Sequence, residues 1–188
     1  MLRKVAGELR HHVPFTLFGT LIGVGVMLAV VFSGMPRHVS HKLFYSFHPL
    51  HVLFSAMATA GMYTLHGRRN LLLTLVVGYV GAIGIATLSD SLIPYAGEAM
   101  LGLHGHSHIG FIEMWWLVNP LAVAGVLIGY WRPHTKVPHA AHVLLSMSAS
   151  LFHVTMALGG RIDVPTALTI ASFLFLAVWV PCCTSDIV

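Results

Sequence analysis

The sequence contains few charged residues. Only 9% of its 188 residues are Asp, Glu, Lys or Arg, whereas soluble globular domains carry about 25%. Hydrophobic residues make up 56% of the chain, and the mean hydropathy is +0.82. These values exclude a soluble globular domain, and the length suits one bundle of membrane helices. We therefore expect a single polytopic membrane domain over residues 1–188.

Cysteines and catalytic sequence motifs are also scarce. The two cysteines, Cys182 and Cys183, are adjacent and cannot form a disulfide framework. The chain has no G-x-S-x-G, no P-loop and no G-x-G-x-x-G motif, so nothing supports serine hydrolysis, phosphate handling or dinucleotide binding. The net charge of +4 is modest; it reports orientation in a bilayer, and we expect no nucleic-acid partner.

Six apolar stretches are long enough to cross a bilayer, which takes about 20 residues of helix. They cover 13–34, 48–66, 70–89, 110–131, 139–160 and 164–187. The predicted fold is an all-α integral membrane protein, a bundle of six transmembrane helices. We expect the first stretch to be retained, because it is longer than the core of a cleavable signal peptide. Pro49 is expected in the first turn of the second helix, a favoured position for proline.

The basic residues predict the orientation of these helices. Seven of the ten fall on one side of the predicted membrane, and three fall on the other. The positive-inside rule then places both termini in the cytoplasm and makes the chain a multi-pass protein of the cytoplasmic membrane. The predicted loop 90–109 has Asp90 and Glu98 but no basic residue, which fits the outside. The first set is Arg3, Lys4, Arg10, Arg68, Arg69, Arg132 and Lys136, and the second is Arg37, Lys42 and Arg161.

Glycines at four-residue spacing predict close helix packing. Gly19 and Gly23 lie in the first stretch, and Gly125 and Gly129 lie in the fourth. Small residues at this spacing let helix backbones approach each other in a bilayer. Besides the lipid bilayer, such glycine faces would suit a second copy of the chain or another subunit of a membrane complex.

Histidine is the residue that the chain has in excess, with 14 copies. Imidazole is the commonest metal ligand, and polar rings are rare in membrane segments unless they have a function. A His-x-x-His pair opens the second stretch, and three histidines alternate with Gly105 and Ser107 before the fourth. We expect these groups to share an outer transition-metal site. Its predicted ligands are His48, His51, His104, His106, His108, Glu113 and His153.

A second group of ligand-type residues falls on the predicted inner side. Imidazole and carboxylate suit zinc, iron, nickel or copper(II), and thiolates favour softer ions such as copper(I). The identity of the metal is therefore left open among zinc, copper, iron and nickel. The predicted inner site comprises His139, His142, Cys182, Cys183 and Asp186.

Ligand-type residues near both membrane faces favour transport of the metal ion across the membrane. Asn119-Pro120 is expected to interrupt the fourth helix, as helix breaks do in transporters. One alternative is an intramembrane metalloenzyme, di-iron or zinc, because repeated His-x-x-His pairs resemble the motifs of membrane hydroxylases and desaturases. A metalloenzyme of this kind requires the pair His48/His51 to lie close to the pair His139/His142 in one site. Another alternative is a haem-b electron carrier, with axial pairs drawn from His51/His153 or His66/His142.

Overall fold

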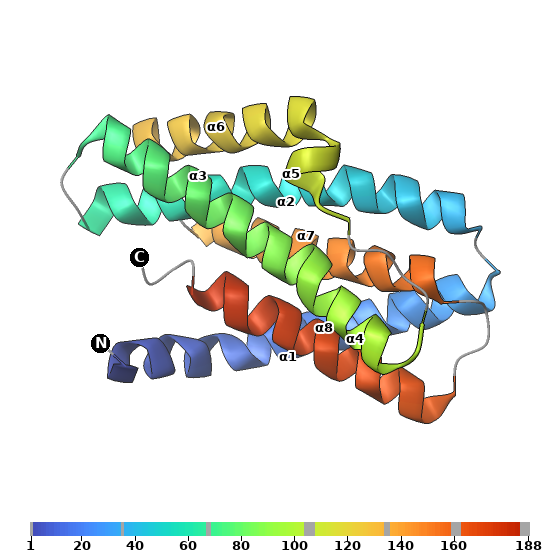
Figure 1. The fold of residues 1–188 in the computed structure, drawn as a ribbon. Helices are drawn as coiled ribbons and strands as arrows, with labels where there is room; N and C mark the ends of the chain where they lie inside the picture. The colour runs from blue at the N-terminus through green and yellow to red at the C-terminus, as the bar shows by residue number, and fades with distance from the viewer. Residues whose placement is uncertain are drawn as a thin grey trace.

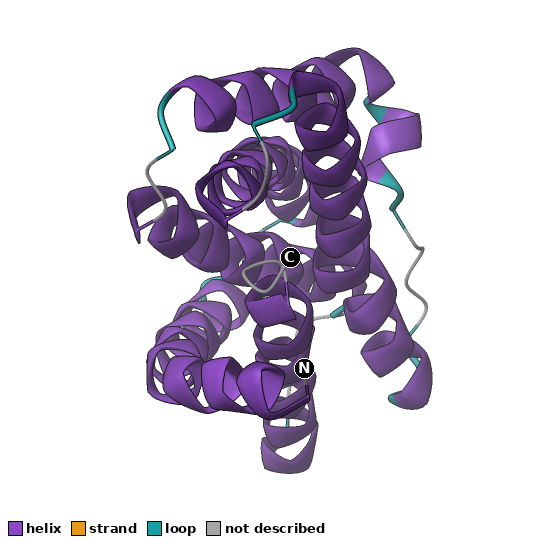
Figure 2. Cartoon of the chain, turned by 90° about the vertical axis from the view of Figure 1, so that its left-hand side faces the viewer, coloured by secondary structure: helices purple, strands orange, loops and turns teal. Residues whose placement is uncertain are grey.

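The computed structural model describes residues 2–34, 36–66, 69–103, 108–133, 136–158 and 163–184. Within these ranges the chain is helical and contains no strand (Figure 2). His104, His106, His134 and Asp186 lie outside the described residues. The expectation of an all-α protein is therefore confirmed for the described part of the chain.

The helices of the described residues follow the predicted stretches, with different ends. The segments α3, η1 and α4 join without a break into one helix over Leu71–Met100. The elements are α1 (Leu2–Phe32), α2 (Arg37–His66), α3 (Leu71–Thr87), η1 (Leu88–Leu92), α4 (Ile93–Met100), α5 (Gly110–Glu113), α6 (Trp115–Trp131), α7 (Lys136–Ala157) and α8 (Val164–Thr184).

Three helical segments of the described chain are long and apolar enough to cross a membrane, which indicates a membrane protein. They are Leu71–Met100, Val137–Ala157 and Val164–Cys182. Large apolar side chains also cover the outside of the bundle: Leu21, Leu72 and Leu168 are 65%, 71% and 64% exposed. Polar residues, in contrast, are buried between the helices. Apolar outside and polar inside is the arrangement that a lipid environment favours.

Helices α2 and α7 pack against each other at the centre of the bundle. Helix α2 also packs on α3 and α6, through a small core that includes Val52, Ala86 and Val118. Helix α7 packs on α1 and α8, through a larger core that includes Met147 and Leu174. Helices α2 and α7 therefore lie between α6 on one side and α1 and α8 on the other (Figure 1), with an apolar core on each side of their interface.

Helix α2 is longer than predicted. The sequence placed its start at 48, but it begins at Arg37 and contains Pro49 in its interior. Ser40, Phe44, His48 and His51 are all buried, and their spacing of three or four residues places them on one helix face. Packing of this face stabilises the first half of α2, although charged and polar residues lower the hydropathy there.

The predicted outer loop 90–109 is wrong over its first half. Helix continues through η1 and α4 to Met100, and Asp90 and Glu98 are 0% and 2% exposed. The sequence predicts that both acidic side chains lie in a loop outside the membrane, because residues 90–109 contain no Lys or Arg. Both instead have histidine partners inside the bundle, as described below, and those partners remove the usual reason for a carboxylate to stay in water.

The predicted interruption at Asn119-Pro120 is not observed. Helix α6 runs through Pro120 from Trp115 to Trp131. The chain breaks earlier, at Met114, whose φ of −121° and ψ of 42° separate the short helix α5 from α6. This break positions α5 beside α2.

The start of α8 is set by a side-chain cap. The Asp163 carboxylate accepts a hydrogen bond from the backbone N–H of Thr166 at 3.2 Å, as an N-cap residue does. Hydrogen bonds from the side chain and backbone of Thr166 lower the pKa of Asp163, which is exposed to solvent. Helix α7 ends at Ala157, and α8 begins at Val164, directly after this cap.

The glycine spacing of the fourth stretch is explained by packing within the chain. A Cβ on Gly125 would overlap the carbonyl oxygen of Leu53, and one on Gly129 would lie 2.5 Å from the carbonyl oxygen of Met57. Helix α6 therefore contacts the backbone of α2 directly. Gly19 has no atom within 4 Å of its hypothetical Cβ, and a Cβ on Gly23 would meet the side chain of Met147 at 3.1 Å. The first pair therefore makes no comparable approach to the backbone of another helix.

Candidate functional site

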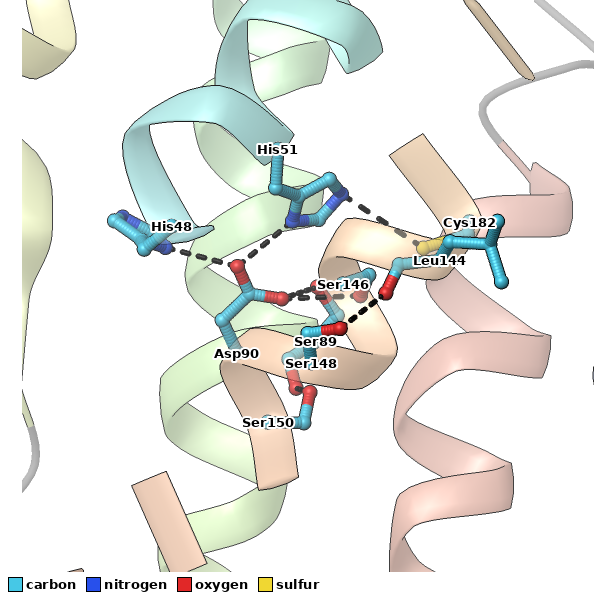
Figure 3. A network of polar contacts seen from close by, with 9 residues as sticks. All are labelled: His48, His51, Ser89, Asp90, Leu144, Ser146, Ser148, Ser150 and Cys182. Carbon is cyan, nitrogen blue, oxygen red and sulfur yellow. Dashed lines mark hydrogen bonds and ion pairs between the residues drawn. The ribbon is translucent and has the colours of Figure 1, made fainter. Parts of the chain in front are cut away.

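The carboxylate of Asp90 is the centre of a buried hydrogen-bond network (Figure 3). Its Oδ2 lies 2.9 Å from Nδ1 of His48 and 2.7 Å from Nδ1 of His51. Its Oδ1 accepts hydrogen bonds from the hydroxyls of Ser89 at 2.7 Å and Ser146 at 3.0 Å. Four donors thus satisfy this buried carboxylate, and they connect α2, η1 and α7.

The shared carboxylate fixes the orientation of both imidazoles. An ionised carboxylate only accepts hydrogen bonds, so Nδ1 of His48 and of His51 must carry the proton. Each Nε2 then keeps its lone pair. Metal-ligating histidines have this carboxylate–imidazole arrangement, in which the ring nitrogen away from the carboxylate binds the ion.

Asp90 reaches this position through a widened helical turn. The five residues Leu88–Leu92 form a π-helix, and Ser89, Asp90 and Ser91 are all fully buried. The hydroxyl of Ser150 donates to the carbonyl oxygen of Ser89 at 2.8 Å and ties α7 to this turn. Single π-turns inside α-helices occur frequently at functional sites.

A thiol and a third imidazole lie beside His51. The Sγ of Cys182 is 4.0 Å from Nε2 of His51, close to the roughly 3.5 Å that separates nitrogen and sulfur ligands of one tetrahedral zinc ion. The ring of His142 stacks on that of His51, with centroids 5.9 Å apart. Both ring nitrogens of His142 are buried, and no side chain of the described residues forms a hydrogen bond with them. We call His48, His51, Asp90, His142 and Cys182 the central site.

A second group of histidine–carboxylate pairs lies at the other end of α7. The Nδ1 of His153 is 2.8 Å from Oε1 of Glu98, and Nδ1 of His108 is 3.2 Å from Oε2 of Glu113. The hydroxyl of Tyr45 donates to Glu113 and lies 3.0 Å from Nδ1 of His108. We call these five residues the outer cluster.

Phe44 separates the central site from the outer cluster. Its fully buried ring stacks on His48, with centroids 5.4 Å apart and planes inclined by 16°. The same ring meets His153 edge-on, also at 5.4 Å. The ring also contacts His108, with centroids 5.9 Å apart. Phe44 therefore contacts histidines of both groups and lies between them.

The predicted outer site is divided between these two groups. His48 and His51 lie in the central site, whereas His108, Glu113 and His153 lie in the outer cluster. His104 and His106 lie outside the described residues.

The predicted inner site is also rearranged. His142 and Cys182 join the central site, and the ring of His139 is 5.0 Å from that of His142. The expected separation of His51 from His142 by depth is wrong, because α2 is longer than predicted and their rings are in contact. Nothing is described of the side chain of Cys183 or of Asp186.

Two acidic residues were not included in the predicted site. Asp90 and Glu98 are the direct partners of three of the candidate histidines. Their signal was present in the sequence, since a carboxylate next to a long apolar stretch marks a functional site by default. The prediction assigned them to a loop and so missed them.

The donors of the central site are near one another but are not arranged as a closed metal cage. No three His, Cys, Asp or Glu side chains of the described residues converge in metal-binding geometry. For the haem alternative, the structure pairs His51 with Asp90 and His153 with Glu98, and the side chain of His66 lies outside the described residues. No family model, curated protein or solved structure shows significant similarity to the chain.

Gly110 controls the approach of α5 to the central site. A Cβ at this position would overlap Nε2 of His48. Gly110→Ala is therefore expected to displace His48 or α5 and to destabilise the protein by about 1–3 kcal/mol, the usual cost of overpacking. Thermal unfolding in detergent measures this effect. Gly84→Ala is the matched control, because its added Cβ meets no atom within 4 Å. Equal losses of stability in Gly110→Ala and Gly84→Ala would show that the close contact between Gly110 and His48 is not required.

Proposed function

We propose that the protein binds a transition-metal ion in the central site and transports it across the membrane. The observation that carries this proposal is the Asp90 carboxylate, which orients His48 and His51 from within the bundle. A buried carboxylate that fixes the tautomer of two histidines is typical of metal centres. A thiol beside the imidazoles favours zinc or copper(I) over harder ions.

The donors around His51 suit an ion that must be released again. His51, His142 and Cys182 come from α2, α7 and α8 and offer two nitrogens and one sulfur. Three ligands leave a coordination position open, in contrast to the closed four-ligand cages of structural zinc. Transport likewise requires binding weak enough for the ion to leave. Side-chain rotations would bring these donors to coordination distance.

Histidines follow one another along the α2–α7 interface. This arrangement favours transport of an ion rather than catalysis at one site. Ring contacts lead from His139 through His142 to His51, and Asp90 links His51 to His48. Beyond Phe44 the outer cluster continues in the same direction. An ion at the bilayer centre costs at least about 2.5–3.5 kcal/mol without partners, so successive ligands along the interface lower the barrier.

We infer six membrane spans with both chain ends on the cytoplasmic side. The long helices of the described chain run alternately between the two ends of the bundle, so α1 begins at the end where α8 finishes (Figure 1). The distribution of basic residues, seven against three, supports the orientation.

Reporter fusions test this topology. A reporter after Arg69, between α2 and α3, is expected to be active only in the cytoplasm, and one inserted at Gly105 only outside. The reason is that a single helix, Leu71–Met100, connects the two positions. Finding both reporters on the same side would reject the six-span arrangement.

Metal flux into proteoliposomes tests the function. His51→Gln retains an N–H donor for Asp90 but replaces the imidazole by a weak amide ligand, and Cys182→Ser removes the sulfur. We expect the double variant to lose at least about tenfold in zinc flux, since each 1.4 kcal/mol of lost binding is a factor of ten. His38→Ala is the control, because His38 is exposed on the same helix. Wild-type flux in the double variant would refute the assignment.

The intramembrane metalloenzyme is the second candidate. It required the His48/His51 pair to meet His139/His142, and the ring contact between His51 and His142 meets that condition. The two functions differ in one measurement. Stoichiometric metal in the wild-type protein without flux, under both metal and proton gradients, would favour the enzyme.

A further inference from the structure

We propose that the outer cluster is a second, independent cation site, in which His108 and His153 bind one divalent transition-metal ion through their Nε2 atoms. Glu98 and Glu113 are positioning residues that hold the two imidazoles, and water completes the coordination. The inference deepens the proposed function. Only the role of this site in transport rests on that function; the binding itself does not.

The buried pair of His153 and Glu98 has one ring nitrogen and one carboxylate oxygen without a partner among the described residues. The two residues are 1% and 2% exposed. Their mutual contact uses Nδ1 and Oε1. The remaining atoms, Nε2 of His153 and Oε2 of Glu98, are buried without a partner among the described residues. A buried polar atom without a partner costs about 1–3 kcal/mol, and a bound cation would remove that cost for the imidazole nitrogen.

His108 repeats the arrangement of His153 on the other side of the cluster. Its Nδ1 lies within hydrogen-bond distance of Glu113 and of the Tyr45 hydroxyl. Protonation at Nδ1 again leaves the lone pair on Nε2. Each imidazole therefore has its own carboxylate partner, as in the central site, where Asp90 serves two histidines.

The spacing of the two rings fits a shared ion. The centroids of His108 and His153 are 5.6 Å apart, with the planes inclined by 72°. Two imidazoles on one tetrahedral ion, with metal–nitrogen distances of about 2.0–2.1 Å, have centroids about 5–6 Å apart. The exposed His41 has its ring 6.0 Å from that of His108, which provides a further imidazole toward the surface.

The outer cluster differs from the central site in its donor atoms. Nitrogen and oxygen groups make up the outer cluster, whereas the central site includes the Cys182 sulfur. Imidazole and carboxylate suit borderline divalent ions such as zinc, cobalt or nickel, and sulfur shifts the preference toward softer ions. Because Phe44 lies between the groups, an ion would occupy one site or the other rather than bridge them.

Cobalt(II) titration of the full chain, purified in detergent without a histidine tag, separates the two sites. Cobalt bound to thiolate gives a charge-transfer band in the near ultraviolet, whereas cobalt bound only to nitrogen and oxygen gives d–d bands in the visible. We expect wild-type protein to bind two cobalt ions and to show both kinds of band. His108→Ala/His153→Ala should retain one ion with the charge-transfer band, and His51→Gln/Cys182→Ser should retain one without it.

Further variants keep the test independent of folding. His108→Gln/His153→Gln preserves side-chain polarity and should also lose one ion while remaining monodisperse. Glu98→Gln should retain the outer ion but bind it about 10–100-fold more weakly, as expected for a residue that orients a ligand. His38→Ala should bind two ions.

The outcomes distinguish this inference from the proposed function. The outer site would be overturned if His108→Ala/His153→Ala and His108→Gln/His153→Gln each still bound two cobalt ions. It would also be overturned if the wild-type protein bound one cobalt ion and showed only the charge-transfer band. One wild-type ion without that band, lost in the outer variants, would support the outer site and refute the central one. Two bound ions without zinc flux would leave the outer site standing and refute transport.

Discussion

Asp90→Ala is expected to abolish metal flux and to lower stability by at least about 1–3 kcal/mol, the cost of leaving a buried hydrogen-bond donor without its acceptor. The Asp90 carboxylate accepts hydrogen bonds from His48, His51, Ser89 and Ser146. Alanine leaves these four donors without an acceptor inside the bundle, and unsatisfied buried donors are costly. Thermal unfolding in detergent and zinc flux in proteoliposomes measure the two effects.

Asp90→Asn is the matched variant that separates charge from shape. Its amide oxygen can still accept from the two histidines, and its N–H groups can donate to the serine hydroxyls. We expect this variant to fold, while its zinc affinity falls by about 10–100-fold because the carboxylate no longer raises the basicity of the imidazoles. Wild-type zinc affinity in Asp90→Asn, measured by titration calorimetry, would show that the carboxylate has only a structural role.

Gly125→Ala/Gly129→Ala is expected to have the second large effect, a loss of stability of about 1–3 kcal/mol or more at each site. The added Cβ atoms would meet the carbonyl oxygens of Leu53 and Met57. These are backbone atoms of α2 and cannot move as a flexible side chain would, so α6 must shift away from α2. Thermal unfolding in detergent checks the prediction.

Gly19→Ala is the control for this pair of substitutions. Its Cβ would meet no atom within 4 Å, and alanine favours a helix over glycine by about 1 kcal/mol. Unchanged or increased stability is therefore expected. If the double variant of α6 proves as stable as Gly19→Ala, the close contact between α6 and α2 is not required.

The sequence by itself determined that the protein is a helical bundle of membrane type. Low charge and long apolar runs are typical of membrane helices, because a backbone in lipid must form all its hydrogen bonds within the protein and a helix does so within one segment. The spacing of His48 and His51 also predicted that the two rings share a helix face. Both rings reach the same carboxylate oxygen of Asp90, which confirms this local inference.

Tertiary structure alone decided which candidate ligands meet. Asp90 is 42 and 39 residues from its two histidines, and Cys182 is 131 residues from His51. Hydropathy also misplaced the start of α2, where Arg37, His38 and Lys42 are polar. It misplaced the end of the helix at Met100, since it counts Asp90 and Glu98 as polar whether or not they have partners. Burial of these two carboxylates depends on the packing of η1 and α4 against α7, and a helical period specifies neighbours only within one helix.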